Sequence, residues 1–311
     1  MDLIFFIFGT VLLLFSGDML VRAAVDISLK MAVSPMIVGL TVIAFGTSAP
    51  ELLVGIQATW NGFEGLALGN IIGSNITNVL LILGAPALIM AVKSSDTALT
   101  WNYYYMLLAT LLFIAFLFFG EIKFWAGLFL IFLLVLFVLQ AILSSSSSEE
   151  NYSNPELMPD TKKLNSWILG VFLFVGFVGL PVGASILITS ATSISITIGV
   201  SEEVIGLTVV AIGTSLPELA TSIAAAFRRQ VNLLLGNVIG SNMFNILGIA
   251  GAAALISPLQ LTDSIEGISL TVLFLASICL APIIIFKKSI NRFTGVLFIL
   301  FYIIYLVRLF Q

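Results

Sequence analysis

The sequence contains no histidine, a single cysteine and very few charged residues. The absence of histidine excludes Ser-His catalysis, His-ligated zinc and His-ligated haem. Because Cys279 is the only cysteine, a disulfide framework and a Cys-based metal site are excluded as well. The net charge is −4, which argues against a nucleic-acid partner. These absences remove most catalytic chemistries, and we expect the protein not to be an enzyme.

Apolar residues dominate what is present. Of the 311 residues, 60% are hydrophobic and 9% are charged, whereas soluble domains carry about 25% charged residues. The apolar runs are continuous rather than alternating, and a membrane-spanning helix needs about 20 such residues. The sequence therefore predicts an all-α membrane protein with ten transmembrane helices. The expected spans lie near residues 3–30, 36–58, 66–92, 100–119, 122–143, 166–198, 203–226, 231–256, 267–286 and 291–309.

The basic residues predict how these spans are oriented. Ten spans place alternate loops on opposite sides, and only Lys123 and Arg308 then fall on one side. The opposite side holds Arg22, Lys30, Lys93, Lys162, Lys163, Arg228, Arg229, Lys287, Lys288 and Arg292. Since cytoplasmic loops carry the excess of Lys and Arg, we expect a multi-pass plasma-membrane protein with both termini on the extracytoplasmic side. The lipid bilayer is its expected environment, and no obligatory protein partner is evident.

Two motifs recur at a constant offset of 167 residues. GTSAPE at 46–51 returns as GTSLPE at 213–218, and GNIIGSN at 69–75 returns as GNVIGSN at 236–242. Chance similarity between apolar helices would share Leu and Val rather than Pro, Glu and Asn. Each half holds five expected helices, an odd number, so the second copy must enter the membrane upside down, as in secondary transporters. We predict two inverted five-helix repeats, 1–143 and 166–311, joined by a cytoplasmic linker at 144–165.

Two acidic residues, Glu51 and Glu218, fall in the middle of expected spans. A carboxylate at that depth costs roughly 2.5–3.5 kcal/mol on insertion scales. No Lys or Arg occurs in the central part of the four helices that carry the motifs. A bound cation is therefore the expected compensating charge.

The residues before each glutamate are suited to a cation site. Thr47 and Ser48 share a helix face with Glu51. Pro50 lacks an N–H and crowds the carbonyl of Gly46, so the helix should break there and free carbonyls from Ala44 onward. The second half repeats the pattern with Ala211, Gly213, Thr214, Ser215 and Pro217.

The GN motifs add two polar stripes at i, i+4, i+8 spacing. The stripes are Asn70, Ser74 and Asn78 in the first half, and Asn237, Ser241 and Asn245 in the second. Gly69, Gly73, Gly236 and Gly240 lie beside them and should allow close helix approach. The assembled donor set is all oxygen, which hard cations such as Ca²⁺ and Na⁺ prefer. Asn75 and Asn242 are expected to support the helices rather than to bind ions.

The paired motifs resemble the alpha repeats of the calcium/cation antiporter superfamily, most closely those of prokaryotic sodium/calcium exchangers. The resemblance implies that Glu51 and Glu218 are ligands shared by Ca²⁺ and Na⁺, which are transported, and that no cofactor takes part. It implies alternating access through sliding of spans one and six. It also implies further ligands at Ala44, Thr47, Ser48, Ser74, Asn78, Ala211, Thr214, Ser215, Ser241 and Asn245.

One departure from the family leaves the coupling ion open. Many members carry aspartate at one or both positions that match Asn78 and Asn245, so stoichiometry and potassium dependence stay undecided. Proton-coupled members tend to carry glutamate where this chain has Gly73 and Gly240, which favours Na⁺. The alternative is a Ca²⁺/H⁺ or other divalent-cation exchanger. A channel is disfavoured by the inverted repeat, and an intramembrane hydrolase by the lack of a general base.

A charged stripe occupies the expected cytoplasmic end of span one. Asp18, Arg22, Asp26 and Lys30 follow one another at i, i+4 spacing. Such pairs stabilise an exposed helix face. We therefore expect a surface stripe whose charges are mutually satisfied.

Overall fold

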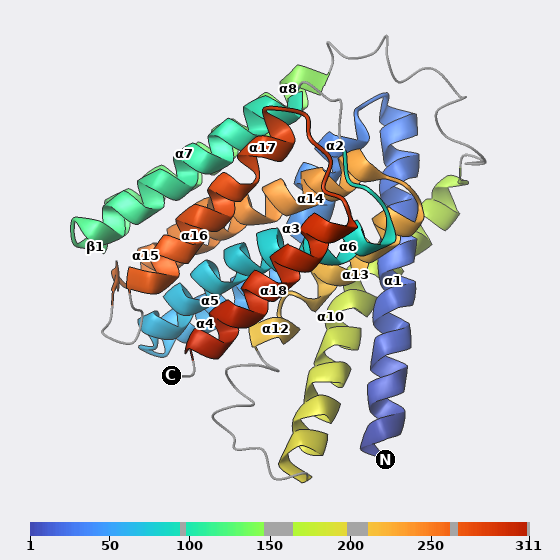
Figure 1. The fold of residues 1–311 in the computed structure, drawn as a ribbon, viewed down its shortest axis with the longest axis horizontal. Helices are drawn as coiled ribbons and strands as arrows, with labels where there is room; N and C mark the ends of the chain where they lie inside the picture. The colour runs from blue at the N-terminus through green and yellow to red at the C-terminus, as the bar shows by residue number, and fades with distance from the viewer. Residues whose placement is uncertain (94–97, 146–163, 198–210, 262–266, 310–311) are drawn as a thin grey trace.

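A computed structural model describes residues 1–93, 98–145, 164–197, 211–261 and 267–309, and it is helical almost throughout (Figure 1). The first half contains α1 (Asp2–Met31), α2 (Pro35–Val38), η1 (Gly39–Ile43), α3 (Ala44–Thr47), α4 (Ala49–Trp60), α5 (Glu64–Thr77), η2 (Asn78–Ile82), α6 (Gly84–Ile89), α7 (Ala98–Phe118), β1 (Glu121–Ile122) and α8 (Phe124–Ser145). The second half contains α10 (Ser166–Thr197), α12 (Ala211–Gly213), α13 (Leu216–Phe227), α14 (Val231–Met243), η6 (Phe244–Ile249), α15 (Ala250–Ile256), β2 (Leu259–Gln260), α16 (Gly267–Cys279), α17 (Ala281–Ile284) and α18 (Arg292–Leu309).

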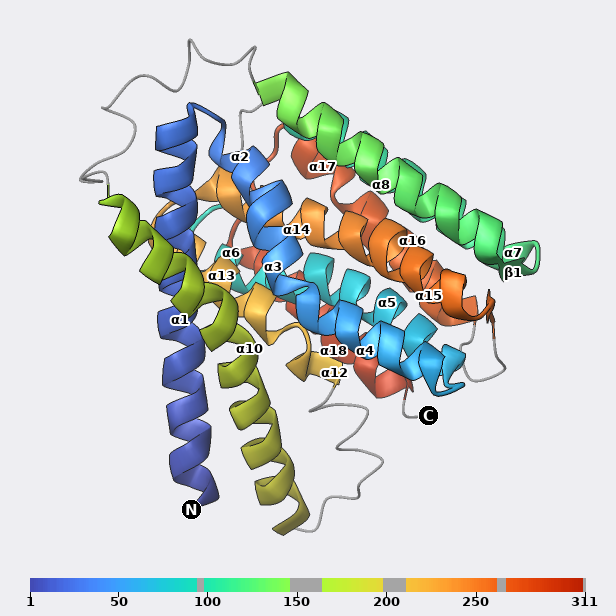
Figure 2. The same ribbon diagram turned by 180° about the vertical axis from the view of Figure 1, so that it is seen from behind.

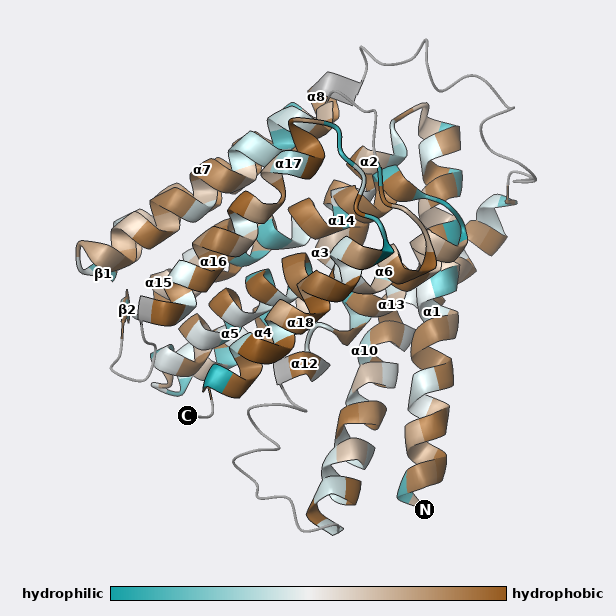
Figure 3. Ribbon diagram, viewed as in Figure 1, coloured by the Kyte–Doolittle hydropathy of each residue, from teal (hydrophilic) through white to brown (hydrophobic). Residues whose placement is uncertain are grey.

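Seven helices in the described part of the chain are long and apolar enough to cross a membrane, and one bent pair, Pro35–Thr47 with Ala49–Trp60, makes an eighth. Two shorter apolar helices, Leu216–Phe227 and Ile268–Ile284, fall inside the remaining expected spans. Figure 3 shows α1, α10, α16 and α18 coloured as hydrophobic along most of their length. The predicted all-α membrane class is confirmed, whereas the number of ten spans stays a prediction. The linker expected at 144–165 falls mostly outside the described residues.

The helices α1 and α10 form a closely packed pair (Figures 1 and 2). Glycines allow this contact, because a Cβ at Gly9 would meet the Leu187 nitrogen at 2.8 Å and one at Gly183 would meet the Leu13 nitrogen at 2.9 Å. Small residues at such crossings let two backbones approach. Both helices extend beyond the rest of the bundle, with the N-terminus at the free end of α1. The pair is thus attached to the bundle along only part of its length.

A second glycine contact joins the two halves. A Cβ at Gly236 of α14 would collide with the Met36 carbonyl oxygen, and one at Gly39 of η1 with the Leu233 carbonyl oxygen. A Cβ at Gly240 would collide with the Leu40 carbonyl oxygen. The helix α14 therefore lies directly on α2 and η1, backbone against backbone. For Gly69 and Gly73 the described residues place no atom within 4 Å of such a Cβ.

The charged stripe on α1 differs from the expected surface stripe. Asp18 pairs with Arg22 at 3.0 Å, but it also accepts a bond from Arg228 of α13's C-terminal end at 2.5 Å. Asp26 is only 4% exposed; it pairs with Lys30 at 2.8 Å and accepts the Leu164 N–H at 2.9 Å. Leu164 and Arg228 contact this face of α1, so the stripe joins α1 to the second part of the chain, although Arg22 stays 45% exposed.

Short strand contacts tie loops together at two places. Ile122 of β1 pairs with Leu259 of β2 in an antiparallel arrangement. Val92 forms an isolated antiparallel bridge with Ile290. These pairs were not expected from the continuous apolar runs, because two-residue strands carry no detectable periodicity. Each pair joins two loops that the alternation of spans assigns to the same side, and the two pairs fall on opposite sides.

Candidate cation-binding site

Both GTS-x-PE motifs lie where a helix is interrupted. Ser48 separates α3 from α4 with φ −82° and ψ 2°, and Ser215 precedes α13 with φ −92° and ψ 7°. In each case proline follows in the first turn, where its missing N–H costs nothing. In the first half the break bends the span by 44°. Two separate parts of the chain thus adopt the same local structure for the same reason.

The two glutamates occupy the first turns of the helices that follow these breaks. Glu51 of α4 and Glu218 of α13 are each 1% exposed. The partial positive charge of a helix N-terminus favours a carboxylate at this position. The two carboxyl groups are near enough for their charges to interact. Two acids from opposite halves therefore share one buried region.

One hydroxyl group connects the two halves at these acids. The Ser48 hydroxyl donates a hydrogen bond to Glu218 Oε1 at 3.2 Å. In the other direction, Ser215 lies beside the Glu51 carboxyl group, and both serines are buried. The structure thereby brings together Glu51, Glu218, Ser48 and Ser215. The helices α5 and α14, which carry the GN motifs, pack against α4 and α13 respectively.

Several buried oxygens around these acids have no hydrogen-bond partner in the described part of the chain. They include Glu51 Oε2, Glu218 Oε2, Asn78 Oδ1, Ser215 Oγ, Ser241 Oγ and Asn245 Oδ1. Buried polar atoms are almost always hydrogen-bonded in folded proteins. A group of unpaired oxygens without an adjacent Lys or Arg, on elements that pack together, is suited to a hard cation. No cluster of three or more Asp, Glu, His or Cys occurs among the described residues, so only two formal charges are present.

The remaining predicted ligands have differing surroundings. Ser74 and Thr47 are buried, and the Thr47 hydroxyl donates to Ile43 O at 3.1 Å. The Ala44 carbonyl is not released by the break, since it accepts the Ser48 N–H at 3.0 Å and the Thr47 hydroxyl at 3.4 Å. Thr214 donates to Asn70 Oδ1 at 3.5 Å.

The second set of break residues faces α10. Ala211 begins α12, and its side chain lies outside the described residues. A Cβ at Gly213 would collide with the Ile188 side chain of α10, and one at Gly46 with the Phe177 ring of the same helix. The helix α10 therefore packs directly on both helix breaks.

Two polar links at the site were not predicted from the sequence. Asn242 accepts a hydrogen bond from Asn78 Nδ2 at 2.9 Å across the two halves. Thr77 donates to the Tyr302 hydroxyl of α18 at 3.0 Å. The recurrence of Asn75 as Asn242 signals that this position matters, but nothing in the spacing indicates which residue of the other half it contacts.

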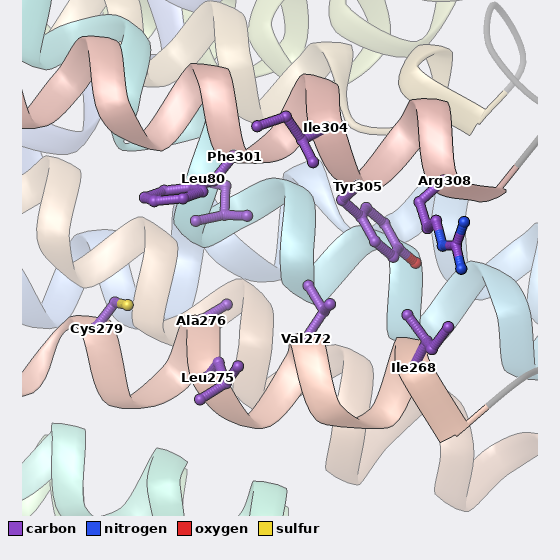
Figure 4. A pocket seen from close by; sticks show the side chains of 10 residues that line it. All are labelled: Leu80, Ile268, Val272, Leu275, Ala276, Cys279, Phe301, Ile304, Tyr305 and Arg308. Atoms are coloured by element: carbon purple, nitrogen blue, oxygen red, sulfur yellow. The ribbon is translucent and has the colours of Figure 1, made fainter.

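An apolar cavity lies outside the polar cluster. It has a volume of about 380 Å³ and lies between α16 and α18, with Leu80 of η2 in its wall (Figure 4). Its lining is apolar apart from Cys279, Tyr305 and Arg308. A lining without carboxylates or amides offers little to a cation. The polar cluster at the helix breaks, and not this cavity, is therefore the candidate cation site.

Comparison with known proteins gives a consistent result. The chain matches the family described as sodium/calcium exchanger protein over residues 1–143 and 168–311. The sodium/calcium exchanger MaX1 of Methanosarcina acetivorans is 31% identical over 337 residues, covering 97% of this chain and 96% of the relative. The inner membrane protein YrbG of Escherichia coli (strain K12) is 34% identical over 279 residues, covering 88% and 86%. The structure of the sodium-calcium exchanger NCX_Mj soaked with zero Na⁺ and Ca²⁺ superimposes with a TM-score of 0.85 at 31% identity, covering 99% and 98%.

Proposed function

Because this chain belongs to the sodium/calcium exchanger protein family, and so to a family of transporters rather than enzymes, we propose that it exchanges Na⁺ for Ca²⁺ across the membrane. The ions compete for one site built on Glu51 and Glu218. The observation that carries the proposal is the convergence of two buried carboxyl groups from opposite halves with unpaired oxygens around them. Ca²⁺ and Na⁺ are cargo here and not cofactors.

Charge balance explains why the two ions would exclude each other. Two ionised carboxylates are neutralised by one Ca²⁺ or by two Na⁺. A site loaded with both would carry excess positive charge in a low-dielectric interior, where uncompensated charges are costly. An empty site would leave two like charges facing each other. Loaded forms with one kind of ion are therefore the stable ones, which is the basis of obligatory exchange.

The pair α1 and α10 is suited to open the site to one face at a time. The helix α10 packs on both helix breaks through Phe177 and Ile188. Its main partner is α1, and the two together extend past the bundle. Sliding of this pair would cover one break while exposing the other. The helices α4, α5, α13 and α14 would stay in place and hold the ligands.

The proposed orientation and repeat follow from the sequence and agree with the loop contacts. Inverted five-helix repeats 1–143 and 166–311 in ten spans would put both termini on the extracytoplasmic side. In that arrangement the Val92–Ile290 bridge joins two loops of the basic, cytoplasmic side. The β1–β2 pair joins two loops of the opposite side. Each pairing connects loops on one side only, which supports the alternation of spans.

A sodium gradient should drive Ca²⁺ uptake into vesicles that contain the purified protein. The GN motifs carry Gly73 and Gly240, so no additional carboxylate is available there to carry a proton. With Na⁺ inside and ⁴⁵Ca²⁺ outside, we expect uptake that ceases when choline replaces Na⁺. The measurement is the initial rate of ⁴⁵Ca²⁺ accumulation at constant pH.

The control for this experiment is a pH gradient without Na⁺. We expect no uptake above that of protein-free vesicles. Uptake driven by the pH gradient alone would instead support the alternative, a Ca²⁺/H⁺ exchanger of the same fold. Currents without any counter-ion requirement would indicate a channel.

A further inference from the structure

We propose that Asn242 is a positioning residue of the cation site, which holds Asn78 with its carbonyl oxygen free for the transported ions. This inference rests on the proposed function. Asn78 Nδ2 donates to Asn242 Oδ1 at 2.9 Å, and both residues are buried. Asn78 begins η2 and Asn242 lies near the C-terminal end of α14. The bond therefore joins ligand-bearing segments of the two halves.

A third residue determines the direction of this bond. Asn242 Nδ2 lies 3.6 Å from Met106 Sδ of α7, to which it donates. A thioether sulfur can only accept. The amide of Asn242 must therefore turn its NH₂ group to Met106 and its oxygen to Asn78. The Asn242 oxygen is an acceptor, so Asn78 must turn its NH₂ group toward it. The Met106 sulfur thus fixes the orientation of both amides.

The consequence at Asn78 is an oxygen with no partner. Asn78 Oδ1 is buried and accepts no hydrogen bond within the described part of the chain. The segment η2 packs against α13, which carries Glu218, and against α14. If the amide turned over, an NH₂ group would take the place of this oxygen. An NH₂ group is a hydrogen-bond donor and offers no lone pair to a cation, so the ligand would be lost.

An asparagine needs this constraint, whereas an aspartate does not. The two oxygens of a carboxylate are equivalent acceptors, so turning the group over still presents an oxygen to the ion. Many family members carry aspartate at one or both of the positions that match Asn78 and Asn245, as noted above. This chain has an amide there, and the Met106–Asn242 contact selects which end of that amide is free.

The equivalent pair in the repeat, Asn75 and Asn245, provides a matched control. Asn75 corresponds to Asn242 in the repeat, but its Nδ2 donates to Ile71 O of its own helix at 2.6 Å. Asn245 corresponds to Asn78, and both its amide atoms lack partners in the described part of the chain. Among the described residues, a neighbouring asparagine therefore holds the amide of Asn78 but not the amide of Asn245.

Removing the acceptor at 242 should weaken Ca²⁺ binding. We expect Asn242→Leu to raise the Ca²⁺ dissociation constant about tenfold, because the freed amide of Asn78 no longer keeps its oxygen in the place of the ligand. Asn242→Asp keeps the acceptor and should bind Ca²⁺ at least as tightly as the wild type. Asn75→Leu should change the constant by less than about twofold. The measurement is calorimetric titration of the purified full chain with CaCl₂ in Na⁺-free buffer.

A double substitution separates positioning from general packing. In the Asn78→Asp background, adding Asn242→Leu should change Ca²⁺ affinity by less than about twofold, because a carboxylate needs no orienting partner. The same tenfold loss in that background would overturn the inference. If the wild type itself binds neither Ca²⁺ nor Na⁺, the proposed function fails instead. If Asn242→Leu does not fold, the volume-conserving Met106→Leu replaces it, with a loss of about threefold expected and an unchanged affinity contradicting the inference.

Discussion

Replacement of Glu51 or Glu218 by glutamine abolishes sodium-driven Ca²⁺ uptake, with initial rates reduced about 100-fold or more. Each substitution keeps the shape of the side chain and removes one of the two formal charges in the site. A charge pair at about 4 Å is worth about 4 kcal/mol at an effective dielectric constant of 20, and twice that for a divalent ion. The remaining neutral oxygens therefore cannot replace the binding energy that is lost with either carboxylate. The measurement is ⁴⁵Ca²⁺ uptake into proteoliposomes.

The matched control is Glu121→Gln. Glu121 is a surface acid in β1 that pairs with Lys123 at 2.9 Å, and its loss should leave uptake unchanged. Calorimetry on the same preparations distinguishes a binding defect from a transport defect, and we expect both glutamine variants at 51 and 218 to lose Ca²⁺ binding. Retention of normal uptake by either of them would show that the ions bind elsewhere.

Gly236→Val lowers the apparent unfolding temperature in detergent by about 10 °C or more. The new side chain would collide with the Met36 carbonyl and lie 3.0 Å from the Leu40 nitrogen. These atoms belong to backbone, so no side-chain rotation relieves the collision, and α14 must move away from α2 and η1. Forcing bulk into a packed interior costs about 1–3 kcal/mol or more, and a protein of this size loses a few degrees per kcal/mol.

Gly170→Val is the control for that substitution. Gly170 is exposed on α10, and no described atom lies within 4 Å of an added Cβ. The Gly170→Val substitution introduces the same side chain into a helix, with the same change in helix propensity, but without the collision. Equal unfolding temperatures for the two variants would mean that the contact between α14 and the first half contributes little to stability.

Much of the site could be predicted because its features are local. Pro50 and Pro217 lack an N–H wherever they stand, so each motif interrupts its own helix without reference to the rest of the chain. Continuous apolar runs determine the membrane class for the same reason. The recurrence of two motifs at a constant offset then indicated that both interruptions serve one purpose. The family resemblance built on these motifs is confirmed by the comparisons.

Contacts across the halves could not be predicted in this way. The Ala44 carbonyl keeps its backbone partner despite the break, since Ser48 still donates to it. Asp26 is buried and accepts a hydrogen bond from the Leu164 N–H, although its spacing is that of a surface ion pair. Gly236 and Gly240 meet backbone of the other half, while their repeat partners Gly69 and Gly73 meet no described atom.

The sequence by itself determined the membrane class, the two buried acids, the helix breaks beside them and the oxygen-only donor set. These depend on residue chemistry and on spacing within a single turn or two of helix. Only the tertiary structure decided which oxygens are unpaired, that Ser48 reaches Glu218, and that Asn242 contacts both Asn78 and Met106. The partners in these contacts stand more than 100 residues apart, and the direction of an amide depends on every neighbour that surrounds it, which no local pattern encodes.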